Sequence, residues 1–156
     1  MKPEISIVIP AYNEEESLYP LFDELYPVMV GLERSFELIF INDGSKDKTL
    51  PILYDLYKKC PEMRVIDLNG NFGQHMAIMA GFEEARGEII ITLDADLQNP
   101  PDEIPNIIEA MDEGHDVVGT YRVDRQDPIF RKLASKIVNK LTNKIAKLNI
   151  KDYGCM

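Results

Sequence analysis

The sequence predicts one α/β domain, a three-layer sandwich with a mostly parallel central sheet. Two observations predict it: short apolar, β-branched runs alternate with longer segments of helical periodicity, and polar residues gather where the apolar runs end. The chain has 156 residues, a natural size for one domain, and 45% of them are hydrophobic, so it can bury a core. In such folds ligands bind outside the carboxyl ends of the strands.

The apolar runs predict five strands, at residues 5–9, 36–41, 63–68, 88–93 and 116–121. The run at 88–93 is continuous, which is typical of a strand buried on both faces. Helical periodicity predicts helices at 14–31, 46–59, 73–86, 102–113 and 128–148. We expect Asn13 or Ser17 to cap the first helix and Ser45 or Asp47 to cap the second. Pro20 and Pro27 are expected to kink or split the first helix.

Charge is distributed unevenly along the chain. The formal net charge is -10, which argues against general nucleic-acid binding. Residues 122–151 contain nine basic and two acidic residues, whereas residues 1–121 contain eight basic and 24 acidic ones. The predicted helix at 128–148 carries lysines along one side and an apolar stripe along another. This pattern fits an anionic membrane surface or, equally, core packing with solvated lysines. We therefore expect a core at 1–121 and a membrane-proximal part of the same domain at 122–156.

Targeting signals are absent from the sequence as it stands. No signal peptide precedes the first apolar run, and no apolar run approaches the roughly 18–20 residues that span a bilayer. Cys60 and Cys155 lack metal-ligand spacing, which is typical of reduced thiols in a cytosolic setting. The chain is therefore expected to be soluble or peripheral to a membrane.

Two aspartates follow the apolar run that ends at Leu93. Asp94 and Asp96 point the same way if the chain stays extended. Their carboxylate oxygens suit Mg²⁺ or Mn²⁺, ions that keep waters and bind substrate phosphates. Gln98 adds a carbonyl oxygen two residues further on. The alternative is a polar turn that caps the next helix.

Three more polar segments follow predicted strands. Residues 10–14 offer an aromatic ring and an amide to a nucleotide base, and Asp43 can accept hydrogen bonds from a base or ribose. Gly44 lets the backbone turn tightly. Taken alone, both segments are better explained as turns with helix caps. Residues 71–75 lie at a predicted helix start, where amide donors and the helix dipole favour phosphate.

These segments together resemble the family 2 glycosyltransferases of the GT-A (Rossmann-like) fold, over essentially the whole chain. The resemblance rests on four motifs in order, at residues 8–14, 42–45, 71–73 and 94–101. The last motif is similar to the branch that uses polyprenyl phosphates, the dolichol-phosphate-mannose synthase-like enzymes. Residues 72–82 and 152–156 most resemble the subgroup that transfers formamido-arabinose to undecaprenyl phosphate, and related polyprenyl-phosphate glucosyltransferases share the frame.

The resemblance implies a role for each matching residue. Nucleotide binding, with uridine as the base, is implied for Pro10, Tyr12, Asn13, Glu14, Asp43, Gln74 and Asp94. The implied ligands of Mg²⁺ or Mn²⁺ are Asp96 and Gln98, and the implied catalytic residues are Asp94, Asp96 and Arg122. The residues implied to hold the acceptor's phosphate are Arg122, Arg131 and Ser135. The last two also lie one helical turn apart, a spacing that suits one phosphate.

The implied reaction moves a sugar, with inversion, from a UDP-sugar to a polyprenyl phosphate such as undecaprenyl phosphate, at the cytoplasmic face of the membrane. The nucleophile is a phosphate oxygen, and a second pKa near about 6 leaves it largely ionised at neutral pH without a strong base. Members of this branch continue past the position that matches Met156 and are often membrane-anchored. The resemblance therefore implies a C-terminally shortened chain that binds UDP with a metal but transfers sugar weakly or not at all.

Two other classes of function stay open on sequence alone. A sugar nucleotidyltransferase uses a similar sheet and metal, but usually has a glycine-rich, Lys- or Arg-bearing loop after the first strand, which residues 10–14 lack. The other alternative is a non-catalytic module that binds nucleotides or membranes, a hypothesis supported by the basic segment alone. Calorimetry with UDP and Mn²⁺ separates these alternatives.

Overall fold

A computed structural model describes residues 2–120 of the chain, and all helices and strands within that range belong to one compact unit, Met1–His115. A second compact unit comprises Asp116–Met156. The predicted division of roles between 1–121 and 122–156 stays a prediction. The strands are β1 (Ile5–Ala11), β2 (Phe36–Asn42), β3 (Met63–Asp67) and β4 (Ile89–Thr92). The helices are α1 (Leu18–Gly31), α2 (Thr49–Tyr57), α3 (Gln74–Glu84) and α4 (Ile104–Asp112), the last preceded by a 3₁₀ turn, η1 (Pro101–Glu103).

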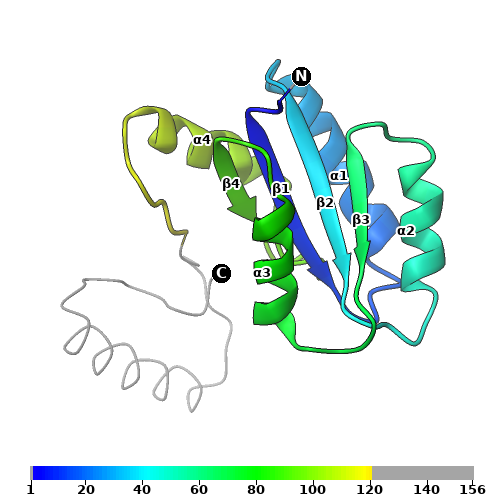
Figure 1. Ribbon diagram of the computed structural model, residues 1–156. Helices are drawn as coiled ribbons and strands as arrows, with labels where there is room; N and C mark the ends of the chain where they lie inside the picture. Colours follow the sequence, from blue (N-terminus) through cyan, green and yellow to red (C-terminus); the bar gives the residue numbers. More distant parts are fainter. Residues whose placement is uncertain (1, 121–156) are drawn as a thin grey trace, which may run out of the picture. The chain divides into compact units, whose positions relative to one another are not determined.

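The four described strands form one parallel sheet in the order β3-β2-β1-β4 (Figure 1). In register, Ile5 of β1 lies beside Phe36 of β2 on one side and Ile89 of β4 on the other. Because all strands run the same way, their carboxyl ends meet at one edge of the sheet. The loops after β1, β2 and β4 are thereby brought together.

Alternate residues of β1 face two different helix layers, as the two-residue period of a strand requires. Ile5, Ile7 and Ile9 join a core with residues of α1, α2 and α4. Val8, on the other side, packs in a smaller cluster with Ala77 of α3. The predicted three-layer α/β architecture is thus confirmed, with α3 alone on its face among the described helices (Figure 1).

Close approach between α3 and the sheet requires a glycine. A Cβ on Gly81 would clash with Val8, because it would lie only 2.4 Å from the Val8 Cγ1 atom. This packing holds α3 over β1 and β2.

Both α1 and α2 begin later than predicted, at Leu18 and Thr49 instead of 14 and 46. The reason is an interlock between the loops 13–15 and 45–49, which exchange five hydrogen bonds. For example, the backbone amide of Asn13 donates to Ser45 Oγ at 3.0 Å, and the side-chain Oδ1 of Asn13 accepts the backbone amide of Lys46 at 2.8 Å. These hydrogen bonds hold the two segments in loop conformations, with Asn13 at φ +56°, outside the helical region.

The N-caps of α1 and α2 also differ from those predicted. Ser17 occupies the N-cap position of α1 but its side chain makes no capping hydrogen bond. Its backbone is already in the helical region, at φ -94° and ψ -25°, and its hydroxyl donates to the Glu14 carboxylate at 2.6 Å. Asp47 accepts the amide of Thr49 at 2.9 Å, one position before the N-cap of α2. Pro27 lies inside α1, which continues to Gly31, so the helix is not split there.

Two strand predictions were wrong. The predicted strand at 116–121 does not form over its described residues 116–120, and Val117 is 86% exposed. β4 is not buried on both faces, since Ile90 is 42% exposed. β4 ends the described sheet, and α3 covers β1 and β2 rather than β4.

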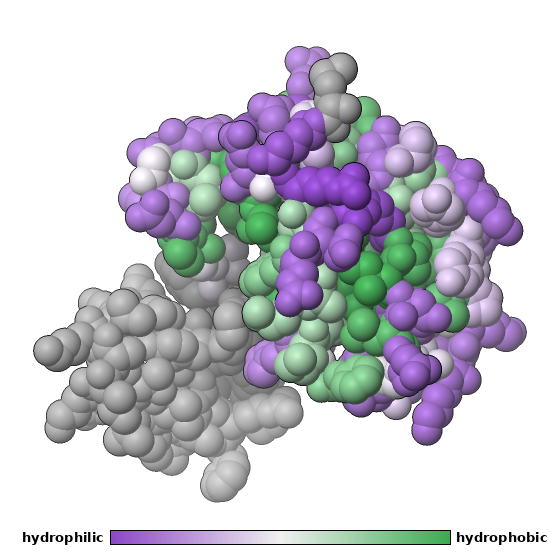
Figure 2. Space-filling view, in the orientation of Figure 1, coloured by the Kyte–Doolittle hydropathy of each residue, from purple (hydrophilic) through white to green (hydrophobic). Residues whose placement is uncertain are grey.

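Apolar side chains also reach the surface on α3 itself, where Met76 and Met79 are 57% and 52% exposed (Figure 2). Among the described residues, no helix is both long enough and apolar enough to cross a bilayer.

Candidate functional site: a polar cavity at the carboxyl ends of the strands

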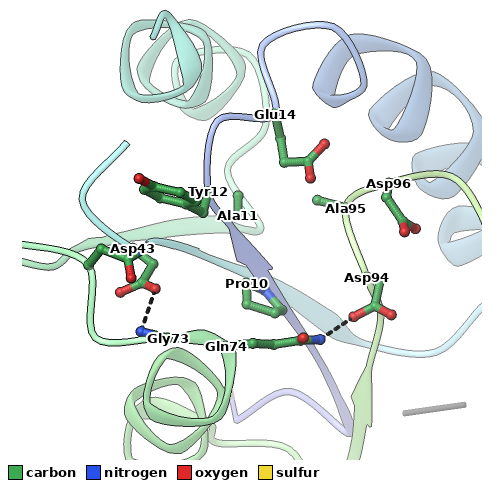
Figure 3. Close-up of a pocket in the computed structure, with 11 residues that line it drawn as sticks. Pro10, Ala11, Tyr12, Glu14, Asp43, Gly73, Gln74, Asp94, Ala95 and Asp96 are labelled. Atoms are coloured by element: carbon green, nitrogen blue, oxygen red, sulfur yellow. Dashed lines mark hydrogen bonds between the residues drawn. The ribbon is translucent and has the colours of Figure 1, made fainter. Parts of the chain in front are cut away.

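A cavity of about 270 Å³ opens where β1, β2 and β4 end and α3 begins (Figure 3). Eleven described residues line it: Pro10, Ala11, Tyr12, Glu14, Asp43, Asn71, Gly73, Gln74, Asp94, Ala95 and Asp96. This is the edge at which a parallel sheet gathers the polar loops that bind ligands. Six of the seven residues predicted to bind the nucleotide are among these residues.

The end of β1 forms the middle of the cavity. Pro10 is the register partner of Ile41, and Tyr12 follows the strand with its side chain 41% exposed. An exposed aromatic ring at the wall of a cavity offers a flat surface on which a nucleotide base can stack. Glu14 also lines the cavity, and its backbone amide donates to Thr49 Oγ1 at 2.8 Å.

Asp43 is nearly inaccessible to solvent, with 2% of its surface exposed. Its two carboxylate oxygens accept the backbone amides of Phe72 and Gly73 at 2.8 and 2.9 Å. The next residue, Gly44, has φ +66° and presses against the Gly70 backbone. The loop after β2 is therefore joined directly to the loop that starts α3.

Asp94 follows β4 and accepts a hydrogen bond from Gln74 Nε2 at 2.7 Å (Figure 3). The chain then turns instead of staying extended, with Leu97 at φ +61°. Within this turn, Asp96 Oδ1 accepts the amide of Gln98 at 3.0 Å. The expected extended geometry is therefore wrong, yet both carboxylates still line the cavity.

Two predicted site residues are not brought to the cavity lining. Asn13 uses its side chain in the interlock with Lys46, as described for the helix starts. Gln98 is exposed and contributes its backbone amide to Asp96. Its assignment as a metal ligand stays a prediction. The acceptor residues Arg122, Arg131 and Ser135 lie outside the described residues.

Four lining residues were not predicted individually: Ala11, Asn71, Gly73 and Ala95. All four lie inside the motifs after the strands, so the signal was present. What sequence alone lacked was the distance between those motifs, which the sheet order supplies.

Among the described lining residues, the charged ones are all acidic: Glu14, Asp43, Asp94 and Asp96. No described group of three His, Cys, Asp or Glu residues is placed to hold a metal by itself. Mg²⁺ is nevertheless bound in many sites by one or two carboxylates together with waters and substrate phosphates. The donor set of Asp94 and Asp96 fits that mode, in which a phosphate ligand completes the coordination.

A parallel sheet with a polar cavity at its carboxyl ends is typical of the class of α/β domains that bind ligands at this edge. Within that class the chain belongs to glycosyl transferase family 2, whose sequence model matches residues 6–155. Membership of this family favours glycosyl transfer over the nucleotidyltransferase alternative.

The chain is similar to the undecaprenyl-phosphate 4-deoxy-4-formamido-L-arabinose transferase of Photorhabdus laumondii. The two are 51% identical over 154 residues, which cover 97% of this chain and 47% of that protein. The chain thus spans about half the length of the curated relatives it matches.

Solved structures share the fold at lower identity. The mannosyltransferase PcManGT of Pyrobaculum calidifontis, in complex with GDP-Man and Mn²⁺, aligns with a TM-score of 0.65 at 20% identity, over 86% of this chain and 39% of that one. S. aureus TarS in complex with UDP-GlcNAc aligns with a TM-score of 0.60 at 23% identity, over 80% of this chain and 37% of that one. The predicted GT-A fold is thereby confirmed.

Proposed function

We propose that the cavity binds a UDP-sugar with one divalent cation, and that the protein transfers the sugar to a polyprenyl phosphate. The observation that carries the proposal is the set of four carboxylates lining a cavity that has no described basic residue. A diphosphate would be repelled there unless a cation lay between it and the aspartates. The relatives are undecaprenyl-phosphate sugar transferases by name, which supports a polyprenyl phosphate as the acceptor.

In this proposal the nucleotide spans the cavity. The base lies against Tyr12 and Pro10, and the diphosphate lies toward Asp94 and Asp96, which would hold Mg²⁺ or Mn²⁺. The cation, when bound, offsets the negative charge of the diphosphate. The chain's own residues orient the donor and leave one face of the sugar open to the acceptor.

The acceptor's phosphate oxygen attacks the anomeric carbon, the bond from that carbon to the UDP oxygen breaks, and UDP leaves with the electron pair. Attack opposite the leaving group inverts the anomeric centre. Because the phosphate is already ionised near neutral pH, no general base is required. Arg122, Arg131 and Ser135 are the residues proposed to hold this phosphate. Donor and acceptor would meet at the cytoplasmic face of a membrane.

Isothermal titration calorimetry with UDP, in the presence and absence of Mn²⁺, tests the donor half. We expect binding that depends on Mn²⁺ and that falls by about tenfold or more in Asp96→Ala, which loses a ligand of the cation. Asp23→Ala, which removes an exposed aspartate of α1, is the matched control and should bind as the unaltered chain does. Equal binding by Asp96→Ala and the control would overturn the metal assignment. No binding of UDP with Mn²⁺, together with tight binding to anionic lipid, would favour a non-catalytic module.

A further inference from the structure

The residues 70–74 connect the two ends of the cavity, and we call this segment the 70–74 bridge. It leads from the loop after β3 into the first residue of α3. At one end the bridge is held by Asp43 after β2, and at the other it reaches Asp94 after β4. These two strands are not neighbours, because β1 lies between them in the sheet.

The Asp43 end of the bridge is held tightly. Both oxygens of the Asp43 carboxylate accept amides of the bridge, those of Phe72 and Gly73. Burial of Asp43 keeps water from competing for these hydrogen bonds, which makes them stronger than at a surface. A Cβ on Gly44 would lie 2.4 Å from the Gly70 carbonyl carbon, so the two backbones are in direct contact.

At the Asp94 end, the bridge makes contact through a side chain. Gln74 follows Gly73, so its backbone position is set by the amide that Asp43 holds. From there Gln74 Nε2 donates to Asp94 Oδ1 at 2.7 Å. Figure 3 shows the Gln74 side chain running past Pro10 toward Asp94, with the Asp43–Gly73 hydrogen bond on the other side of Pro10.

We propose that the 70–74 bridge sets the spacing between the base end and the diphosphate end of the cavity, with Asp43 and Gln74 as positioning residues. Asp43 fixes the bridge, and Gln74 transmits that position to the Asp94 carboxylate. This inference rests on the proposed function, since it assigns Asp94 to the diphosphate end. It differs from direct contact with the nucleotide, the role that sequence resemblance implied for Asp43 and Gln74.

A double-mutant cycle tests the Gln74 step. Titrations with UDP plus Mn²⁺, and with uridine alone, are made on the unaltered chain, Gln74→Ala, Asp94→Ala and the double variant. We expect Gln74→Ala to weaken UDP binding about tenfold, the size of one hydrogen bond to a charged group, and to leave uridine binding unchanged. In the Asp94→Ala background, Gln74→Ala should cause no further loss, because its partner is gone. Asn106→Ala, which removes an exposed amide of α4, is the control.

Additive losses in the cycle, or a loss of uridine binding in Gln74→Ala, would overturn the proposal, because Gln74 would then act on the nucleotide itself. If the unaltered chain binds neither ligand, the proposed function fails instead. The bridge is then tested by amide hydrogen exchange, which needs no ligand. A merely structural role for Gln74 would lower both affinities together with the melting temperature.

Amide hydrogen exchange tests the Asp43 step without any ligand. An asparagine at 43 keeps only one acceptor oxygen, so in Asp43→Asn we expect exchange at Phe72 or Gly73 to become about tenfold faster. Unchanged protection of both amides would show that the carboxylate does not hold the bridge. Because Gln74 is exposed, the Gln74 variants keep the proposal testable if Asp43→Asn fails to fold.

Discussion

Gly44 follows the cavity-lining residue Asp43 at a position that has no room for a side chain. Its φ of +66° disfavours any residue with a Cβ, and that Cβ would meet backbone atoms of Gly70 at 2.4 Å. We expect Gly44→Ala to lower the free energy of unfolding by about 1–3 kcal/mol, measured by urea denaturation. Gly31→Ala is the control, because a Cβ there meets nothing within 4 Å. An equal effect of the two substitutions would contradict the close contact between the loops.

Single residues also show how far sequence could predict the site. Tyr12, Asp43 and Asp94 could be predicted to lie near one another, because polar residues after the strands of a parallel sheet converge at one edge. The two amides held by Asp43 could not be foreseen, since they depend on how the loop at 70–73 folds back. Asp96 reaches the cavity through a turn that needs a left-handed residue at Leu97, and leucine gives no signal for that conformation.

Cys60 illustrates a prediction that the structure supports at the level of one side chain. Its thiol is buried and free, and burial raises the pKa of the thiol to about 11. A thiol with that pKa is almost wholly protonated at neutral pH and is a poor nucleophile. Its predicted role as an unpaired, reduced thiol is consistent with this environment.

At the level of elements, Glu37 joins β2 to its neighbours at the sheet edge opposite the cavity. Its carboxylate accepts from Ser6 of β1 and from the Arg86 amide after α3, both at 2.7 Å, and from Arg64 of β3 at 3.2 Å. Burial alone would raise the pKa of Glu37, but the hydrogen bonds from Ser6, Arg86 and Arg64 outweigh it and hold the pKa below its usual range. The ionised form is therefore the one that stabilises the fold.

Because the pKa of Glu37 is lowered by folding, its stabilising contribution is complete above the unfolded-state pKa of about 4.3 and is lost as the pH falls through the lower, folded-state pKa. We expect Glu37→Gln to lower the free energy of unfolding by about 1–3 kcal/mol at pH 7. The difference from the unaltered chain should shrink below about pH 4. Urea denaturation at pH 7, 5 and 3.5 measures it.

Glu83→Gln, which changes an exposed glutamate of α3, is the control for this series and should follow the unaltered chain closely at each pH. A difference between Glu37→Gln and the unaltered chain that stays constant from pH 7 to pH 3.5 would show that the charge of Glu37 is not what stabilises the fold.

Elements were predicted better than their ends or their burial. Each of β1 to β4 was predicted from its short apolar run, although only β1 and β2 are buried along most of their length. The starts of α1 and α2 were misplaced because the interlock between residues 13–15 and 45–49 joins loops far apart in sequence. The strand predicted at 116–121 does not form over its described residues, because apolar composition alone does not specify the pairing that a strand needs.

At the scale of the whole chain, charge is segregated. Net charge at pH 7 is -10, so the protein as a whole is repelled by an anionic surface. Nine basic residues against two acidic ones in 122–151 would nevertheless allow that segment to approach such a surface locally. We therefore expect the attraction to an anionic membrane to come from residues 122–151.

This segregation of charge predicts selective binding to anionic vesicles. We expect the 156-residue chain to bind vesicles containing phosphatidylglycerol but not purely zwitterionic vesicles, and to be released by raised salt, which screens the attraction. Each lysine near an anionic surface contributes about 1 kcal/mol, so replacing Lys136, Lys140 and Lys144 together by glutamine should weaken binding about a hundredfold. The control replaces Lys46, Lys48 and Lys58, exposed lysines of the acidic part, and makes the same change in net charge. Cosedimentation measures both. If the two triple variants lose binding equally, only net charge matters and the basic segment has no special role at the membrane.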